Sequence, residues 1–307
     1  VLIEDGRAVA VAYTDIGGSS REATADREVL LAGGAVSSPL LLLRSGIGDP
    51  AQLAEHGIDV EAASSQVGEN LQDHLMVGVV MACPKPVTLV DAEKPAQLVR
   101  YLTRRRGLLT SNVGEAAAFV KTRPDLDAPD IELLFGPVPY IDHGQVEDSP
   151  GHGITLGPIL LQPESRGSIR LTAADPSAAP AIDPRYLQDG ADLATMILGV
   201  REAQRLLDTD ALAPFVAEPI EAPAGDDDAA IEAFLAEQAE TLYHPVGTCG
   251  MGADAESVVD PELRVRGIER LRVADASVMP RINRGHTHAP AVMIGERAAD
   301  LVRAAAS

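Results

Sequence analysis

The sequence predicts a mixed α/β chain with two differently built parts. Both ends alternate strand and helix, with a short apolar strand before Gly33-Gly34 and a second buried strand before the long final helix. The middle is a run of strand-like pieces separated by proline-rich loops, which favours a largely antiparallel sheet. With 307 residues, the chain is long enough to bury a large core and to hold more than one domain.

The first strand–turn–helix unit follows a hairpin. Residues Val1–Asp15 alternate around Asp-Gly, a pair typical of a tight turn between strands. Glu28–Ala32 is an apolar strand and Gly33-Gly34 a turn. The hydroxyl and proline pattern Ser37–Pro39 predicts a helix start, and Gly46 predicts its end. We therefore expect half of a nucleotide-binding type of fold near the N-terminus.

The middle and end of the chain supply the remaining elements. The strand candidates are VVMACP, AAAFVK, DIELLFG, HGITLGPILLQP and Arg166–Leu171. Helical spacing covers Leu98–Arg106, Asp189–Leu207, Asp227–Ala239 and Pro290–Ala305, and Leu271–Ala274 is a buried strand ending at Asp275.

Charge and cysteine content narrow the class of protein. The net charge is −21, so the chain as a whole should repel nucleic acid and anionic membrane surfaces. We expect the one basic cluster, Arg104–Arg106, to be a helix end. Two distant cysteines, Cys83 and Cys249, suggest no disulfide framework and favour a cytoplasmic protein. No apolar run reaches the roughly 20 residues that span a bilayer, and the first residues show no signal-peptide pattern.

Two glycine- and proline-rich turns carry three of the seven histidines. His244 lies in YHPVGTCGMG, and His286 and His288 lie in RGHTHAP. Imidazole gives and takes protons near neutral pH, so His244 and His288 facing one cavity could deprotonate an alcohol. A metal site would need further closely spaced ligands, and the two cysteines form no CxxC, so we predict no metal. The remaining alternative is that these histidines are ordinary core or surface groups.

Six segments together resemble one enzyme family. They are EVLLAGGAVSSPLLLLRSGIG, VGENLQDHL, RGSIRLTAADPSAAPAIDPRYL, YHPVGTCGMG, VVDPELRVRGIERLRVADASVMP and GHTHAPAVMIGERAADL. In this order they are similar to the glucose–methanol–choline (GMC) flavoprotein oxidoreductases, nearest the choline-dehydrogenase-like branch, over nearly the whole chain. The family's opening GxGxxG turn, which cradles the FAD pyrophosphate, does not occur in these residues.

The resemblance implies that the chain is divided into a cofactor-binding and a substrate-binding domain. Residues 1–78 and 253–307 would form part of a Rossmann-like FAD-binding domain, and residues 79–252 an antiparallel-sheet substrate domain with helices. The expected FAD contacts come from the two strand ends and from the start of the last helix. These are Ala32, Gly33, Asp275, Ala276, His286, Thr287 and Pro290.

The resemblance also implies a reaction. The expected function is FAD-dependent oxidation of a small-molecule alcohol, with His244 as base, His288 sharing the alkoxide by hydrogen bonding, hydride transfer to flavin N5, and oxygen or a quinone-like carrier as acceptor. One alternative is a GMC-like hydroxynitrile lyase. Another is an inactive piece, or a split half that needs an N-terminal partner chain. A homo-oligomer is a further possible assembly.

Overall fold

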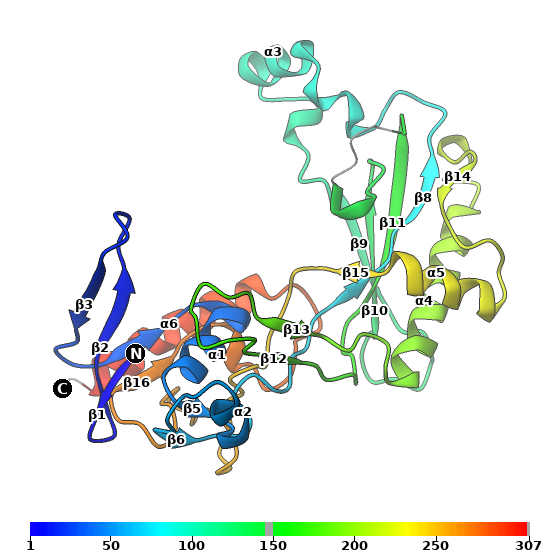
Figure 1. Ribbon diagram of the computed structural model, residues 1–307. Coiled ribbons are helices and arrows are strands. Elements are labelled where there is room, and N and C mark those ends of the chain that lie inside the picture. Colours follow the sequence, from blue (N-terminus) through cyan, green and yellow to red (C-terminus); the bar gives the residue numbers. More distant parts are fainter. Residues whose placement is uncertain (145–149, 306–307) are drawn as a thin grey trace. The chain divides into compact units, whose positions relative to one another are not determined.

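The computed structural model describes residues 1–144 and 150–305, which form two compact units (Figure 1). The first unit comprises residues 1–73, 165–186 and 243–307, and the second comprises residues 74–164 and 187–242. Each unit has its own hydrophobic core of buried aliphatic side chains. The mixed α/β class expected from the sequence is confirmed.

The first unit combines small sheets with helices that surround one core. Two of its sheets are antiparallel, β1–β2–β3 and β12–β13. Two strand pairs are parallel, β4–β16 and β5–β6. The elements are β1 (Leu2–Glu4), β2 (Arg7–Thr14), β3 (Ser20–Thr24), β4 (Val29–Leu31), α1 (Gly34–Arg44), β5 (Ile47–Gly48), α2 (Pro50–Glu55), β6 (Ala62–Ala63), β12 (Ser168–Arg170), β13 (Ala181–Asp183), β16 (Leu271–Val273), the 3-10 turn η5 (Ala276–Val278) and α6 (His288–Ala305).

The N-terminal hairpin is confirmed. Asp5 and Gly6 both have positive φ, 50° and 74°, which is the backbone of the tight turns that suit the twist of two antiparallel strands. Ser20 begins β3, which the sequence analysis did not predict and which pairs with β2 from Thr14↔Ser20 to Ala10↔Thr24. All five residues of β3 are exposed, so no alternation of apolar residues marked this strand in the sequence.

Helix α1 begins earlier than its sequence predicts. It starts at Gly34 instead of at Ser37, and Pro39 lies inside it. The reason is a cap that comes from far along the chain, because the Asp275 carboxylate accepts hydrogen bonds from the Gly34 N–H and the Ser38 hydroxyl. Gly46, with φ of 80°, follows the end of the helix as expected.

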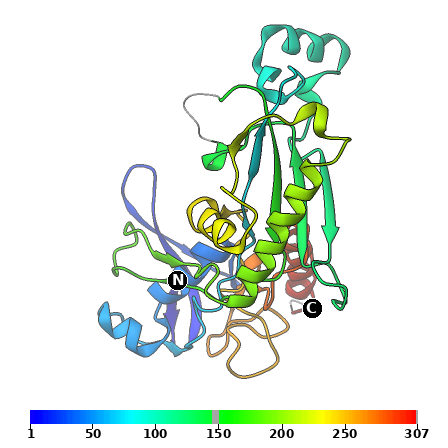
Figure 2. The same ribbon diagram turned by 90° about the vertical axis from the view of Figure 1, so that its right-hand side faces the viewer.

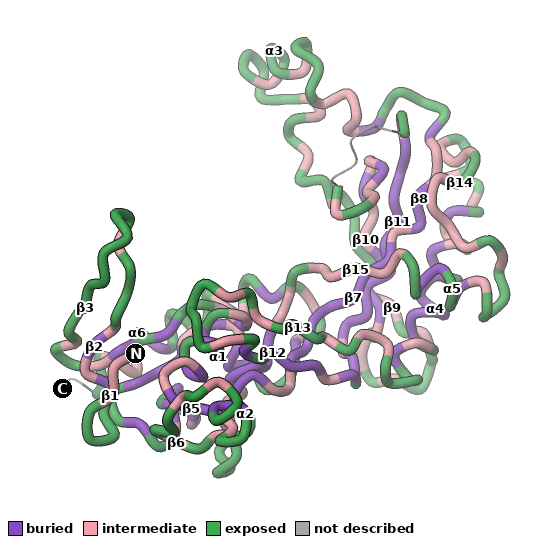
Figure 3. The backbone as a smooth tube through the Cα atoms, viewed as in Figure 1, coloured by how far each residue is buried: buried purple, intermediate pink, exposed green. Residues whose placement is uncertain are grey.

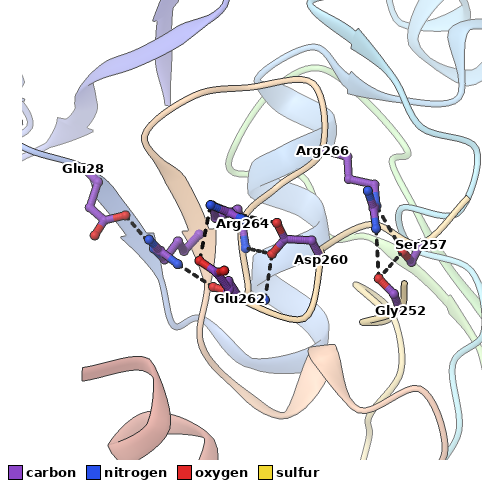
Figure 4. Close-up of polar contacts among 8 residues, drawn as sticks. Glu28, Gly252, Ser257, Asp260, Glu262, Arg264 and Arg266 are labelled. Atoms are coloured by element: carbon purple, nitrogen blue, oxygen red, sulfur yellow. Dashed lines mark hydrogen bonds and ion pairs between the residues drawn. The ribbon is translucent and has the colours of Figure 1, made fainter. Parts of the chain in front are cut away.

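The long loop between residues 252 and 272 is held by arginines (Figure 4). The Arg272 side chain is buried and reaches the Glu28 carboxylate at 2.7 Å. Arg264 pairs with Asp260, and Arg266 donates to the carbonyl oxygen of Gly252. Because Arg272 lies on β16 and Glu28 directly precedes β4, this pair adds a side-chain contact to the pairing of these two strands.

The second unit is an antiparallel sheet with helices, as expected. The strand order is β14–β8–β11–β10–β9, and β7 pairs with β11 and β15. The elements are β7 (Leu75–Met76), β8 (Val79–Ala82), η1 (Leu89–Glu93), α3 (Pro95–Arg104), η2 (Leu108–Thr110), β9 (Ala116–Val120), β10 (Ile131–Gly136), η3 (Asp142–Gly144), β11 (Gly153–Leu160), α4 (Gly190–Leu207), η4 (Ala213–Phe215), β14 (Pro219–Glu221), α5 (Asp228–Gln238) and β15 (Glu240–Thr241).

Helix α4 lies along the sheet of the second unit (Figure 2). The helix is capped by Asp189, whose side chain accepts a hydrogen bond from the Ala191 N–H. Where the helix crosses the strands, Gly199 gives room, since a Cβ there would lie 3.0 Å from Ile131 Cδ1 and 3.1 Å from Pro158 Cβ. The glycine therefore sets how closely the helix approaches the sheet.

The boundaries of the two units differ from those expected. Segments 165–186 and 243–252 belong to the first unit, whereas the sequence analysis placed them with the middle of the chain. The reason is backbone pairing. Gly167 and Leu71 exchange two hydrogen bonds of 2.9 Å, and the N–H of Ile169 donates to the Gly68 carbonyl at 2.7 Å. The substrate and cofactor roles of the two units remain predictions.

Candidate active site

The position of His244 is set by a buried carboxylate. Its backbone N–H donates to Asp73 Oδ1 at 2.8 Å, and the hydroxyl of Tyr186 donates to Asp73 Oδ2 at 2.5 Å. Tyr243, just before the histidine, has φ of 60°, a backbone conformation that costs energy for a non-glycine residue and that turns the chain here. His244 itself is half-buried.

A second set of contacts ties this turn to the segment that leads into α6. Gln72 and Val246 exchange two backbone hydrogen bonds, of 3.0 and 2.8 Å. The Gln72 side chain donates to the Pro280 carbonyl and accepts from the Ile282 N–H, both at 3.2 Å. Asn70 adds a hydrogen bond to the same Pro280 carbonyl. The VGENLQDH motif thus connects the two histidine-bearing segments. The sequence analysis did not assign this role, although the motif itself was recognised.

Thr248 links the histidine segment to α1. Pro39 has no N–H, so the carbonyl of Ala35, four residues earlier, loses its helical donor. The Thr248 hydroxyl donates to that carbonyl at 2.7 Å, and both residues are buried. Cys249, next in the chain, is fully buried, and burial raises the pKa of its thiol. It is a small buried residue and not an activated nucleophile.

The structure brings together the rings of His244 and His286. Their centroids are 5.0 Å apart and the ring planes are perpendicular. His286 was expected to contact the cofactor, and His288 to be the partner of His244. His288 is exposed and is the first residue of α6. The pairing of His244 with His288 remains a prediction, and the observed neighbour of His244 is His286.

The loop before α6 is held by hydrogen bonds on both sides of His286. The Asn283 side chain donates to the Gly285 carbonyl at 2.8 Å, and Gly285 has φ of 154°, which a side chain would oppose. Thr287 is buried and its carbonyl accepts the Ala291 N–H, the first bond of the helix. The helix begins two residues before the expected start at Pro290.

The start of α6 offers backbone donors. The N–H groups of His288 and Ala289 precede the first helical hydrogen bond, and Pro290 has no N–H. No acidic residue lies in this first turn, so nothing from the turn itself neutralises the positive end of the helix dipole. This terminus is suited to a partly negative group.

The second candidate region is the edge where β4 and β16 end. The two strands are parallel and in register from Val29↔Leu271 to Leu31↔Val273, so Ala32 and Gly33 follow the end of β4, and Ala276 lies just past the end of β16. Ala32 and Gly33 are exposed, and Ala276 is half-buried. In parallel sheets, ligands lie at the carboxyl ends of the strands. This edge of small residues fits a nucleotide that lies along the backbone.

The Asp275 side chain accepts hydrogen bonds from its own chain at this edge. Its Oδ2 accepts from Gly34 and Ser38, and its Oδ1 accepts from the Ser277 N–H at 2.8 Å. The carboxylate therefore caps both α1 and η5, and a ligand at this edge meets a carboxylate already bonded to its own chain. The expected contact of Asp275 with a cofactor remains a prediction.

His74 directly follows Asp73 in the chain and belongs to the second unit. His74 is buried and its Nε2 lies 3.0 Å from the Leu161 carbonyl oxygen, as for a hydrogen-bonded core histidine. Within residues 1–144 and 150–305, no group of three or more His, Cys, Asp or Glu side chains is arranged to hold a metal ion. In the same residues, no helix is both long and apolar enough to cross a membrane.

Family models and related sequences agree on one family. The GMC oxidoreductase model matches in two parts, residues 1–76 and residues 163–295. The chain is 52% identical, over 99% of its length, to an uncharacterized GMC-type oxidoreductase of Mycobacterium tuberculosis, covering 58% of that protein. It is 43% identical over 98% to an alcohol dehydrogenase (acceptor) of Pseudomonas putida, covering 56%, and 39% identical over 99% to the mitochondrial choline dehydrogenase of Homo sapiens, covering 52%.

Solved structures show the same fold. A variant of the formate oxidase of Aspergillus oryzae RIB40 superposes with a TM-score of 0.92 at 27% identity, over 99% of this chain and 59% of that one. Pyridoxine 4-oxidase from Mesorbium loti gives 0.83 at 29%, over 97% and 55%. The chain spans a little over half the length of the relatives it matches. The shared motifs, the matched models and these folds show that the chain belongs to the GMC oxidoreductase family.

Proposed function

We propose that this chain carries the acid–base site of an FAD-dependent oxidoreductase that converts an alcohol to an aldehyde or ketone. The observation that carries the proposal is the contact of the His244 and His286 rings, which come from separate turns at the C-terminal end of the chain. The names of the relatives support an alcohol as donor, since they include an alcohol dehydrogenase and choline dehydrogenases. The structural neighbours support FAD as the cofactor.

In this proposal the two imidazoles divide the work on the substrate hydroxyl. His244 accepts the hydroxyl proton, and His286 holds the same oxygen by a hydrogen bond as negative charge develops on it. We give His286 the role that the sequence analysis gave to His288, because His286 is the ring that lies against His244. When bound, FAD supplies the acceptor for the hydrogen and electron pair that leave the carbon.

Hydrogen bonds at the backbone of both segments support the proposal. The His244 N–H donates to Asp73 Oδ1, and the Asn283 side chain donates to the Gly285 carbonyl in the loop before α6, so both segments are held in place. The exposed edge at Ala32 and Gly33 and the open first turn of α6 are where parts of the cofactor would lie. The electron acceptor in the proposal is oxygen or a quinone-like carrier.

The test is flavin reduction by an alcohol without oxygen, in the FAD-loaded protein. His244→Ala should lower the reduction rate at least about a hundredfold, the usual contribution of a positioned base. His286→Gln should also lower it, whereas His288→Gln should have the smaller effect. A His244→Ala protein reduced at the wild-type rate would remove His244 from the reaction. The lyase alternative would be favoured if no alcohol reduces the flavin of the wild-type protein and the same protein cleaves cyanohydrins.

A further inference from the structure

Helix α3 and the turn that follows it depart from the charge of the rest of the chain. Lys94–Gly114 contains five cations, Lys94, Arg100, Arg104, Arg105 and Arg106, and no Asp or Glu. The whole chain has 46 acidic residues against 25 basic ones. This segment is therefore a basic region on an acidic protein.

The helix also exposes its apolar side chains. Leu98, Val99 and Leu102 are 51%, 60% and 60% exposed, and no residue of α3 is buried (Figure 3). Their spacing puts them on one face of the helix. Leu109, in the adjoining turn η2, is 39% exposed. The surface of a soluble protein usually exposes large apolar residues singly, so this cluster indicates an interaction site.

Contacts within the second unit fix which side of α3 faces outward. The helix packs mainly on the 3-10 turns η1 and η2 that flank it in sequence, and Gln97 and Tyr101 are its half-buried residues. Gly107, with φ of 107°, brings the chain back against Arg100. In both views α3 lies at the end of its unit away from helices α4 and α5 (Figures 1 and 2). Leu98, Val99 and Leu102 thus remain open to solvent.

The cations stand at both ends of the apolar face. Lys94 precedes the helix, where it also pairs with Asp91 at 2.7 Å, and Arg104–Arg106 follow the last apolar residue. Arg105 ends the helix with φ of 51° and places its guanidinium 5.1 Å from the Tyr101 ring. Long basic side chains around an apolar stripe can reach lipid headgroups while the stripe enters the acyl boundary.

We propose that α3 docks the protein on the surface of a bilayer that contains anionic lipids. Leu98, Val99 and Leu102 would enter the interface, and Lys94 and Arg104–Arg106 would meet the lipid phosphates. The exposed aliphatic face favours a bilayer over nucleic acid, since a phosphate backbone makes use of the cations alone. Because the rest of the chain is acidic, only this helix would bind the membrane. The net charge alone led to the opposite expectation, that the chain repels anionic membrane surfaces. The proposal does not depend on the reaction proposed above.

The test is sedimentation of the full 307-residue chain with vesicles. We expect binding to vesicles of equal parts phosphatidylcholine and phosphatidylglycerol, weakened by salt, and little binding to pure phosphatidylcholine. Arg104→Gln/Arg105→Gln/Arg106→Gln should lower the partition coefficient about a hundredfold, at roughly fivefold per cation. Leu98→Ser/Leu102→Ser should lower it at least about tenfold, through the lost apolar burial.

Matched variants separate the helix from general charge and hydrophobicity. Arg27→Gln/Arg123→Gln/Arg270→Gln removes three exposed arginines elsewhere, and Ile16→Ser/Val60→Ser removes two exposed aliphatic residues. Both control proteins should bind as the wild type does. Circular dichroism checks that every variant is folded.

Three outcomes would overturn the proposal. One is a wild-type chain that stays in the supernatant with anionic vesicles, including one that binds DNA instead. The second is a triple-glutamine variant of α3 that binds like its matched control. The third is a wild-type dimer that Leu98→Ser/Leu102→Ser turns into a monomer without any vesicle binding, because the face would then belong to a second copy of the chain.

Discussion

At the scale of single residues, the hydroxyl of Thr248 joins the histidine segment to α1. It donates to the Ala35 carbonyl that Pro39 leaves without a helical donor. Thr248→Val keeps the shape and removes the donor, so a buried carbonyl loses its partner. We expect the free energy of unfolding in urea to fall by about 1–3 kcal/mol, with Thr248→Ser well above Thr248→Val. Equal stability of the two variants would show that the hydroxyl contributes nothing.

The hydrogen bonds of the Asp275 carboxylate lead to a similar prediction about stability. Three protein donors, from Gly34, Ser38 and Ser277, meet its two oxygens. Asp275→Asn puts an NH₂ group opposite a donor on one side, which should lower the free energy of unfolding by about 1–3 kcal/mol. Asp189→Asn is the matched control, because asparagine caps a helix as well as aspartate and Asp189 is exposed. A loss as small as that of the control would contradict the capping role.

The acidic cluster beside β14 predicts a pH dependence. Burial, with Glu240, Asp142 and Glu237 nearby, raises the pKa of Glu221 above its ordinary value of 4.5. His143 pairs with Glu240 at 3.0 Å in the same group. A raised carboxyl pKa favours the protonated form in the folded state, so this stability is present at low pH and is lost as pH rises through the folded pKa.

Glutamine imitates the protonated carboxyl, so Glu221→Gln should become more stable than the wild type as pH rises above 4.5. Urea unfolding across that range measures the difference. Glu202→Gln is the opposite control, because hydrogen bonding to Arg205 lowers the pKa of Glu202. That variant should lose a small stabilisation at neutral pH, about 0.3–0.5 kcal/mol. A Glu221→Gln curve parallel to that of the wild type would exclude the raised pKa.

At the scale of elements, the fit of α4 on its sheet depends on Gly199. A Cβ there would lie 3.0 Å from Ile131 and 3.1 Å from Pro158, closer than ordinary van der Waals contact, so Gly199→Leu should lower the free energy of unfolding by about 1–3 kcal/mol. Gly190→Leu, in the first turn of the same helix, should cost much less, because a Cβ there would have no atom within 4 Å. Thermal or urea unfolding of both variants compares them. Equal losses would mean that the helix does not approach the sheet through Gly199.

Elements that local sequence determines were predicted well. The helices expected over Asp189–Leu207 and Asp227–Ala239, the Asp5-Gly6 turn and the strands β8 to β11 lie where their residues indicate. The errors occur where a distant residue decides. Helix α1 starts early because Asp275 caps it, and β3 forms because an exposed segment pairs with β2. Neither cause is visible in the local pattern.

At the scale of the whole molecule, the excess of acidic residues should weaken the fold at low salt. With a net charge of −21, like charges repel throughout the folded chain, and salt screens that repulsion. We expect the urea midpoint to rise between low and moderate sodium chloride. The ion pairs on the surface oppose this trend only weakly, since exposed pairs contribute about 0–1 kcal/mol each. A midpoint that falls with salt would mean that ion pairs outweigh the repulsion.

The family and its two histidine segments could be read from the sequence, but the ring that faces His244 could not. His286 and His288 are two residues apart in a turn, and either ring could point to His244. The choice shows only in the contact of the His286 ring with His244, a residue far away in the sequence. Likewise, Asn70 and Gln72 became visible as the link between the two segments only through their bonds to Pro280.

The pairing of His244 with His286 is tested most directly by the NMR signals of the His244 ring. An imidazole whose centroid is 5.0 Å away and whose plane is perpendicular shifts the ring-proton resonances of its neighbour through its ring current. His286→Asn should therefore move the His244 ring signals, and His288→Asn should leave them nearly unchanged. The reverse pattern would restore His288 as the partner of His244 and contradict the site described above.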